Sequence, residues 1–129
     1  MKFSKWMMMG LLLAITALAG CRSNPVMNVD DAAISLQKQP SIEQVEKAII
    51  RAGSSLGWNI KKVEPGKMEG RLMIRSHVAV VDITYDTRSY SIHYKDSTNL
   101  NYDGTNIHSN YNGWVQNLDR NIQQQLMTL

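Results

Sequence analysis

The sequence predicts an α+β fold, a two-layer sandwich in which two helices cover one face of a four-stranded antiparallel sheet. Apolar residues recur at three- and four-residue steps near both ends of the region 41–129, as in amphipathic helices. Between these segments they alternate with polar residues, as in strands that are buried on one face. Because both helices must bury an apolar stripe against the sheet, we expect them on the same face, in the order αββββα.

The first predicted helix begins at Ser41, whose side chain can cap the helix while Gln44 reaches back to it three residues later. Gly57 can end the helix, since glycine tolerates the left-handed conformation found there. The expected buried stripe consists of Ile42, Val45, Ala48, Ile49, Ala52 and Leu56.

Strands are predicted after this helix because the apolar period falls to two. The first begins at Trp58 and ends at the turn signal Pro65-Gly66, and the second covers residues 68–75. The inward side chains are expected to be Trp58, Ile60, Leu72, Ile74, Ala79, Val81, Ile83, Tyr85, Tyr90, Ile92 and Tyr94.

The connection at Ser76-His77 lacks the Gly and Asn residues that mark a tight turn. One long bent strand is therefore an alternative to a hairpin at this point. A turn over residues 86–89 precedes the last predicted strand.

The final predicted helix follows an Asn-rich loop over residues 96–110 and has Asn110 as its expected cap. Its apolar stripe contains Tyr111, Val115, Leu118, Ile122, Leu126 and Leu129. We expect this helix to pack on the inward sheet residues through Trp114, Leu118 and Ile122.

The first twenty residues predict a lipoprotein signal peptide. Two lysines precede an apolar stretch, residues 6–19, that would reach about 21 Å as a helix, short of the roughly 30 Å hydrocarbon core of a bilayer. This segment resembles the lipobox of bacterial lipoproteins, in which the cysteine accepts diacylglycerol before cleavage on its N-terminal side. The lipobox residues are Leu18-Ala19-Gly20-Cys21.

The resemblance implies a mature protein that begins at Cys21 and is held to the lipid bilayer through that acylated cysteine. Arg22, rather than Asp, follows the cysteine, which by resemblance to Gram-negative sorting rules favours the outer membrane, on its periplasmic side. Cys21 is the only cysteine in the chain, so no internal disulfide can form.

The chain after the signal peptide predicts a flexible tether over residues 21–40 and one globular domain over residues 41–129. The tether segment has few large apolar residues, although Ile34 and Leu36 could instead start a short helix or an edge strand. Without the leader, twelve basic and eleven acidic side chains remain. This balance gives no electrostatic reason to expect nucleic acid as a partner.

The helix, sheet and helix arrangement resembles a group of small uncharacterised lipoproteins of Gram-negative bacteria. The resemblance covers roughly residues 45–126, and it implies an envelope lipoprotein without adding any catalytic residue. It is carried by Ala52-Gly53 before Gly57-Trp58, by Arg75-Ser76-His77, by residues 90–96, and by Ile107-His108 before Tyr111-Asn112-Gly113-Trp114.

The sequence contains no signature of an enzyme, a cofactor site or a metal site, so we expect none of these. Ser91, His93 and Asp82 could share one sheet surface, but residues two apart on a strand lie about 6.6 Å apart, too far for serine activation. A surface pair between His93 and Asp82 is the simpler interpretation. His77 and His108 are expected in capping, loop or packing roles.

The Asn-rich loop resembles a calcium-binding EF-hand loop only in part. Asn99, Asn101, Asp103 and Gly104 match its first positions, but Asn110 stands where a bidentate Glu is required. Asn and Asp-Gly are first of all turn formers, so an ordered turn-rich loop is expected. Alternatively the loop binds a cell-wall sugar or peptide, with Asn99, Asn101, Tyr102, Asn106, His108, Tyr111 and Trp114 as candidates.

The sheet face left uncovered by the helices is the candidate partner surface. Its apolar side chains lie among charged ones, as in many protein interfaces, although an ordinary exposed sheet with scattered valines is the alternative. The candidates are Arg71, Met73, Arg75, Val78, Val80, Asp82, Ser91, His93 and Lys95. We therefore expect a noncatalytic binding or assembly module whose partner is an envelope protein, a cell-wall component or a second copy of the chain. A small periplasmic hydrolase or a sugar- or peptide-binding protein is the alternative.

Overall fold

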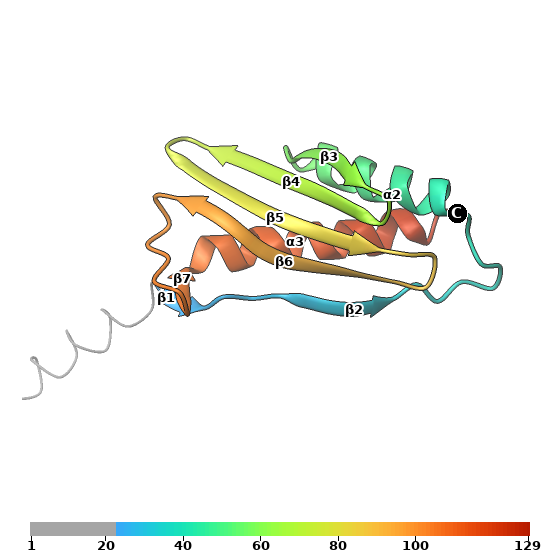
Figure 1. Ribbon diagram of the computed structural model, residues 1–129, viewed down its shortest axis with the longest axis horizontal. Coiled ribbons are helices and arrows are strands. Elements are labelled where there is room, and N and C mark those ends of the chain that lie inside the picture. The colour runs from blue at the N-terminus through green and yellow to red at the C-terminus, as the bar shows by residue number, and fades with distance from the viewer. Residues whose placement is uncertain (1–22) are drawn as a thin grey trace, which may run out of the picture.

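The computed structural model of this protein describes residues 23–129 and has an α+β fold (Figure 1). An antiparallel sheet of five strands has the order β2-β6-β5-β4-β3, and a separate two-stranded sheet pairs β1 with β7. The elements are β1 (Ser23–Pro25), β2 (Val29–Ala33), α2 (Ile42–Ser55), β3 (Asn59–Glu64), β4 (Lys67–Ile74), β5 (His77–Tyr85), β6 (Ser89–Thr98), β7 (Asn106–His108) and α3 (Ser109–Leu126). The predicted signal peptide and Cys21 lie outside the described residues.

Helix α2 has the predicted capping box. The Ser41 side chain accepts a hydrogen bond from the Gln44 backbone N–H at 3.2 Å, and the Gln44 side chain accepts one from the Ser41 N–H at 2.9 Å. Gly57, with φ of 89°, follows the C-cap residue Leu56. The predicted beginning and end of this helix are therefore confirmed.

Helix α3 is capped by His108, so the prediction of Asn110 as its cap is wrong. His108 Nδ1 accepts a hydrogen bond from the Asn110 backbone N–H at 3.1 Å. An unprotonated imidazole nitrogen can serve as an acceptor at a helix N-terminus, as a hydroxyl or carboxylate does. The expected role of His108 as a capping residue is confirmed.

Strands β4 and β5 form a hairpin, not one bent strand. Ile74 pairs with His77 across a two-residue turn, in which Arg75 has φ of 56°. A neighbouring loop residue holds this turn. The Asn99 side chain donates to Ser76 Oγ at 2.8 Å, and the Asn99 carbonyl lies 2.8 Å from His77 Nδ1. A non-glycine residue in the left-handed region is thus supported by contacts from outside the hairpin.

The segment before α2 contributes the fifth strand, so the prediction of a four-stranded sheet is wrong. Val29 pairs with Ile92 and Ala32 with Tyr90, with a bulge between them. The predicted flexible tether over residues 21–40 is likewise corrected for residues 23–33. An edge strand needs few buried side chains, and Val29 is the one buried residue of β2, which explains why its polar sequence suggested a tether.

Both helices pack on the same face of the five-stranded sheet, as predicted (Figure 1). Gly53 lets α2 approach β3 closely, since a Cβ at this position would lie 2.1 Å from Ile60 Cδ1. One continuous core joins the buried stripes of both helices to the inward side chains of the sheet. Its members include Val45, Ile49, Ala52, Trp58, Met68, Leu72, Val81, Ile83, Tyr90, Ile92, Leu118 and Ile122.

A polar cluster at the border of the core joins α2 to β3 and β5. Glu46 accepts hydrogen bonds from Lys62 Nζ at 2.9 Å and from the Tyr85 hydroxyl at 2.9 Å. The bond from Lys62 is the main cause that lowers the pKa of Glu46, and burial is the main cause that raises the pKa of Tyr85 to about 12. Because the pKa of Glu46 is lower in the folded protein, its ionised carboxylate stabilises the fold at neutral pH. This contribution to the free energy of unfolding is lost as the pH falls through the lowered pKa.

Replacement of Leu118 or Ile122 by Ala should lower the free energy of unfolding by about 2–5 kcal/mol, because each change leaves a cavity in the core. Both side chains are fully buried. Urea unfolding followed by circular dichroism measures the effect. Gln124→Ala, at an exposed position of the same helix, is the control and should leave stability nearly unchanged. Equal stability of all three variants would contradict the packing described above.

Candidate binding surfaces

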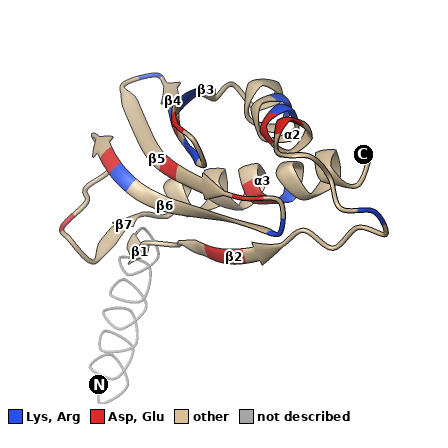
Figure 2. Ribbon diagram, turned by 45° about the vertical axis from the view of Figure 1, so that its right-hand side comes forward, with Lys and Arg blue, Asp and Glu red and all other residues tan. Residues whose placement is uncertain are grey.

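Figure 2 marks the charged residues along the strands of the five-stranded sheet. Most of them lie on the face opposite the helices, called the outer face below. Its position follows from strand alternation, because every second residue points away from the helices. The outer face is formed by Asn59, Lys61, Lys67, Glu69, Arg71, Met73, Val78, Val80, Asp82, Thr84, Ser91, His93 and Lys95.

A row of charged residues crosses the outer face from one edge to the other. Strand register places Lys61 opposite Glu69, Glu69 opposite Asp82, and Asp82 opposite His93. At the far edge, His93 Nε2 lies 2.5 Å from a carboxylate oxygen of Asp30, in β2. The register therefore aligns charged residues from all five strands, and the contact between His93 and Asp30 joins β6 to β2.

Lys95 bridges the two central carboxylates of this row. A register shift pairs Val80 with Asp96 and Val81 with Tyr94, which leaves Lys95 without a residue opposite it. Its Nζ lies 2.7 Å from Glu69 Oε2 and 3.7 Å from Asp82 Oδ1. The hydrogen bond with Glu69 is the main cause that raises the pKa of Lys95. The bulge thus directs an ammonium group between two acidic side chains.

The candidate partner surface is less apolar in the structure than predicted. Met73 is 64% exposed, but Val80 is only 6% exposed, although it lies on the outer face. Val80 stands between Arg71 on β4 and Asp96 on β6. Longer neighbouring side chains can cover a short valine in this position, so the expectation of an exposed Val80 is wrong.

The other candidates differ in their exposure. Arg71 and His93 are exposed, whereas Val78 and Asp82 are half-buried. Arg75 does not lie on the outer face, because it occupies the turn between β4 and β5. An outer-face patch centred on valines is therefore not present, and the exposed groups are mainly charged.

The predicted surface pair between His93 and Asp82 is wrong. The two residues are opposite each other in register, yet His93 bonds to Asp30 of β2. The Ser91 hydroxyl accepts a hydrogen bond from the Asp31 backbone N–H at 2.9 Å. Ser91, His93 and Asp82 therefore do not form a hydrogen-bonded triad.

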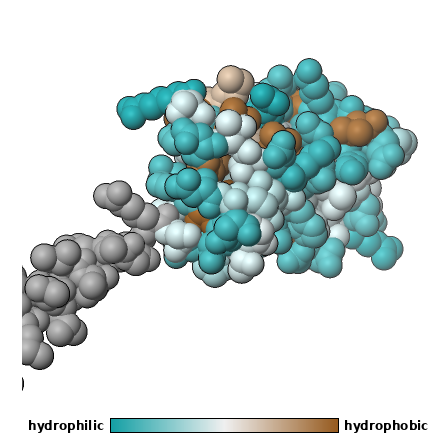
Figure 3. Space-filling model, turned by 60° about the vertical axis from the view of Figure 1, so that its left-hand side comes forward, coloured by the Kyte–Doolittle hydropathy of each residue, from teal (hydrophilic) through white to brown (hydrophobic). Residues whose placement is uncertain are grey.

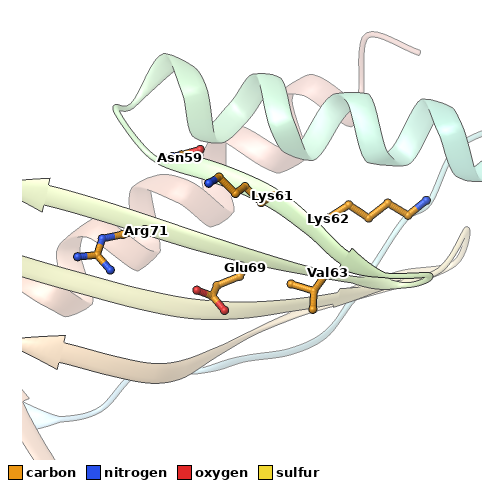
Figure 4. Close-up of a pocket in the computed structure, with 6 residues that line it drawn as sticks. All are labelled: Asn59, Lys61, Lys62, Val63, Glu69 and Arg71. Atoms are coloured by element: carbon orange, nitrogen blue, oxygen red, sulfur yellow. The ribbon is translucent and has the colours of Figure 1, made fainter.

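A shallow pocket of about 370 Å³ lies over β3 and β4 (Figure 4). In the part of the chain that the structure describes, Lys61 and Arg71 have no carboxylate within ion-pair distance, whereas Lys62 pairs with Glu46 and Glu69 pairs with Lys95. Two cations thus remain available at the pocket. The lining residues are Asn59, Lys61, Lys62, Val63, Glu69 and Arg71.

The Asn-rich loop is the ordered, turn-rich segment that the sequence predicts. Asn99, Asn101 and Gly104 have φ of 60°, 53° and 100°. The Asp103 carboxylate accepts hydrogen bonds from the backbone N–H groups of Thr105 at 2.9 Å and Asn106 at 2.7 Å. These two bonds, that of Asn106 first, lower the pKa of Asp103. The carboxylate therefore stabilises a turn of its own loop.

The candidate loop-binding residues divide into structural and exposed groups. Tyr111 is fully buried and its hydroxyl has no hydrogen-bond partner among residues 23–129, and His108 caps α3. Tyr102 is 42% exposed and stacks on Tyr94 with ring centroids 4.1 Å apart. Trp114 is half-buried with its ring 6.5 Å from that of His77. Tyr111 and His108 are thus used by the fold itself, as is Asn99, whose side chain holds the β4–β5 turn.

The partner surface predicted from the sequence omitted Lys61 and Asp30. Strand alternation with Trp58 and Ile60 directs Lys61 outward, and the register of the β3–β4 hairpin sets it beside Glu69, so this residue could have been included. Asp30 could not have been included, because the segment that contains it was interpreted as a tether.

No protein-family model, curated protein or solved structure matches this chain. Within residues 23–129, no group of three or more His, Cys, Asp or Glu side chains is arranged to hold a metal ion. None of the helices in that region has the length and hydrophobicity needed to cross a membrane.

Replacement of Asp103 by Ala should accelerate amide hydrogen exchange at Thr105 and Asn106, since both N–H groups lose their acceptor. In the wild type, the same protection should persist at neutral pH and be lost as the pH falls through the lowered pKa of Asp103, because the protonated carboxyl is a weaker acceptor for the two N–H groups. NMR-detected exchange measures both effects. The Leu118 amide, in the core helix, serves as the control and should not change. Unaltered exchange at both loop positions would show that Asp103 does not hold this turn.

Proposed function

We propose that the protein is a lipid-anchored module of the bacterial envelope that binds a partner without catalysing a reaction. The proposal combines the lipobox that ends at Cys21 with a domain whose outer face is open to solvent. In this proposal Cys21 is acylated, and the domain faces the periplasm from the outer membrane. Two or more acyl chains bind a membrane stably, whereas one chain is marginal.

The pocket with two available cations is the observation that carries the binding proposal. Lys61 and Arg71 extend from neighbouring strands at one end of the charged row, and neither is neutralised by a carboxylate of the described chain (Figure 4). Arg and Lys in such a place bind carboxylates of a partner, with Arg able to form two parallel hydrogen bonds. We therefore assign an acidic group of an envelope protein as the most suitable occupant.

On the rest of the outer face, the two carboxylates paired with Lys95 form a fixed charge pattern that restricts which partners can bind. Glu69 and Asp82 are held by Lys95, so a partner with a negative patch at this point meets like charges. Charge patterns of this type select partners mainly by repelling incorrect ones. The outer face thus favours a partner whose acidic group reaches Lys61 and Arg71 while its remaining contact surface is neutral or basic.

The alternatives from the sequence have less support in the geometry. A hydrolase using Ser91 and His93 requires these side chains to act together, but they bond to Asp31 and Asp30 of β2. For a sugar- or peptide-binding loop, Tyr102 is an exposed ring that could contact a ligand. Tyr111 is buried in the core, and the ring of His108 caps a helix.

Replacement of Cys21 by Ala should abolish lipidation and cleavage of the precursor, because the thiol is the acyl acceptor. Radiolabelled palmitate incorporation and detergent partitioning measure the loss, and the precursor should migrate more slowly in a gel. Ser23→Ala, two residues further on, leaves the cysteine in place and should behave as the wild type. Free wild-type protein in the periplasmic fraction would reject the anchor.

Reversal of the pocket charge, with Lys61→Glu and Arg71→Glu together, should abolish an envelope complex that is captured by cross-linking in cells. Both side chains are exposed, so the domain should remain folded. Arg51→Glu, on the exposed side of α2, is the matched control and should retain the complex.

The charge-reversal experiment has three possible outcomes, and each identifies a different partner or site. Loss of a cross-linked heterologous protein in the double variant supports the pocket. Loss of a species at twice the mass of the chain would identify a homodimer. A complex that survives in the folded double variant would show that the pocket is not the partner site.

A further inference from the structure

The described chain begins very close to the proposed lipid. Ser23 follows Cys21 by two residues, and two residues span at most about 7 Å. Ser23 is not in a loose arm, because it pairs with His108, the cap of α3, in the β1–β7 sheet. Asn112 binds the same segment through the Met27 N–H and the Pro25 carbonyl, both at 2.9 Å. Acyl chains on Cys21 would therefore hold this end of the domain beside the bilayer, with no long spacer.

Three segments meet at this end of the molecule. The Val26 N–H donates to the Thr105 carbonyl at 3.0 Å, which joins β1 to the Asn-rich loop. Asn99 of that loop holds the tip of the β4–β5 hairpin through Ser76. We name the three segments together, residues 23–26, 73–77 and 99–108, the anchor end. Figure 1 shows the same end at the left of the molecule, where the grey trace joins it.

The anchor end exposes large apolar and aromatic side chains. Met73 is 64% exposed, Tyr102 is 42% exposed and Ile74 is 37% exposed. In Figure 3, which brings this side of the molecule forward, tan and brown side chains lie among teal and white ones. Tyrosine is well suited to the interface between water and lipid, because its ring is apolar and its hydroxyl is polar.

The charge of the anchor end is compatible with lipid headgroups but does not by itself attract them. Arg75 extends at the tip of the hairpin and Arg22 precedes β1, whereas Asp103 and Asp96 are nearby acidic groups. The Asp103 carboxylate is occupied by two backbone N–H groups of its own turn. Apolar and aromatic contact must therefore supply most of the affinity.

From these observations we infer that the anchor end rests on the bilayer surface, with Met73, Ile74 and Tyr102 at the headgroup level. The inference depends on acylation of Cys21, which belongs to the proposed function above. One lipid attachment leaves a domain free to rotate, whereas a second contact with the membrane fixes its orientation. The apolar side chains at the hairpin tip and in the loop supply that second contact.

This orientation determines how the outer face is presented. The strands run from the anchor end to the opposite end of the molecule, where the β3–β4 and β5–β6 turns lie (Figure 1). The nine residues of β5 extend about 30 Å at 3.3 Å per residue. The strands then point away from the membrane, and the pocket beside Lys61 and Arg71 opens sideways, parallel to the bilayer. A partner would meet the face in the periplasm close to the membrane, and need not enter the bilayer.

Depth measurement on the lipidated protein tests the orientation. Met73→Cys and Thr105→Cys place a fluorescent label at the hairpin tip and in the loop, and Arg88→Cys places the same label in the turn at the opposite end. All three positions are exposed, and Cys21 does not react with the label when its sulfur is bonded to diacylglycerol as a thioether. The purified proteins are reconstituted in vesicles of phosphatidylethanolamine and phosphatidylglycerol that contain spin-labelled lipid.

Spin-labelled lipid should quench the labels at positions 73 and 105 and leave the label at position 88 unquenched. Flotation of each variant with the vesicles reports separately on the anchor. Variants that float but show no quenching at 73 and 105, or equal quenching at all three positions, overturn the orientation while leaving the anchor intact. Variants that fail to float overturn the anchor, and the orientation with it.

Discussion

Burial of the sheet on one face only is the constraint on which the rest of this structure depends. Each helix carries one apolar stripe, and the core receives both stripes against the same set of inward side chains, including Val81 and Ile83. Since neither helix has a second apolar stripe, the opposite face is left to solvent. That face can therefore hold charged groups such as Lys95, whose burial would be costly without partners.

The N-terminal segment completes the sheet at the edge that the hairpins leave open. β2 covers part of β6 with backbone hydrogen bonds. On the outer face, the Asp30 side chain contacts His93 and the Asp31 backbone N–H donates to the Ser91 hydroxyl. β1 then joins the start of α3 through β7. These pairings connect residues far apart in the sequence, and they bring the first described residue to the end of the molecule that carries the loop and the hairpin tip. In the proposed function, this arrangement replaces a spacer between lipid and domain.

The candidate surfaces were predicted in part. Alternation alone assigns Arg71, Met73 and His93 to the outer face, and all three are exposed there. It does not predict that Val80 is covered, because that depends on the lengths of the side chains on two other strands. Nor does it predict the partner of His93, which comes from a segment more than sixty residues earlier. The loop was correctly expected to form turns. The burial of Tyr111 depends on tertiary packing, in which Tyr94 lies edge-on to Tyr111 and Tyr102 stacks on Tyr94.

The sequence by itself determined the α+β class, both helices and most of their stripes, the capping box at Ser41 and the alternation of β3 to β6. These features depend on contacts between residues a few positions apart, so local pattern is sufficient to specify them. Within the predicted stripes, Leu56 and Leu129 are wrong, because both are exposed at the ends of the helices. Tertiary structure alone decided the fifth strand, the β1–β7 pair and the bulge that directs Lys95 to Glu69. Edge pairing and register are settled by backbone hydrogen bonds to distant strands, and a polar segment such as residues 23–33 carries little apolar signal of that pairing.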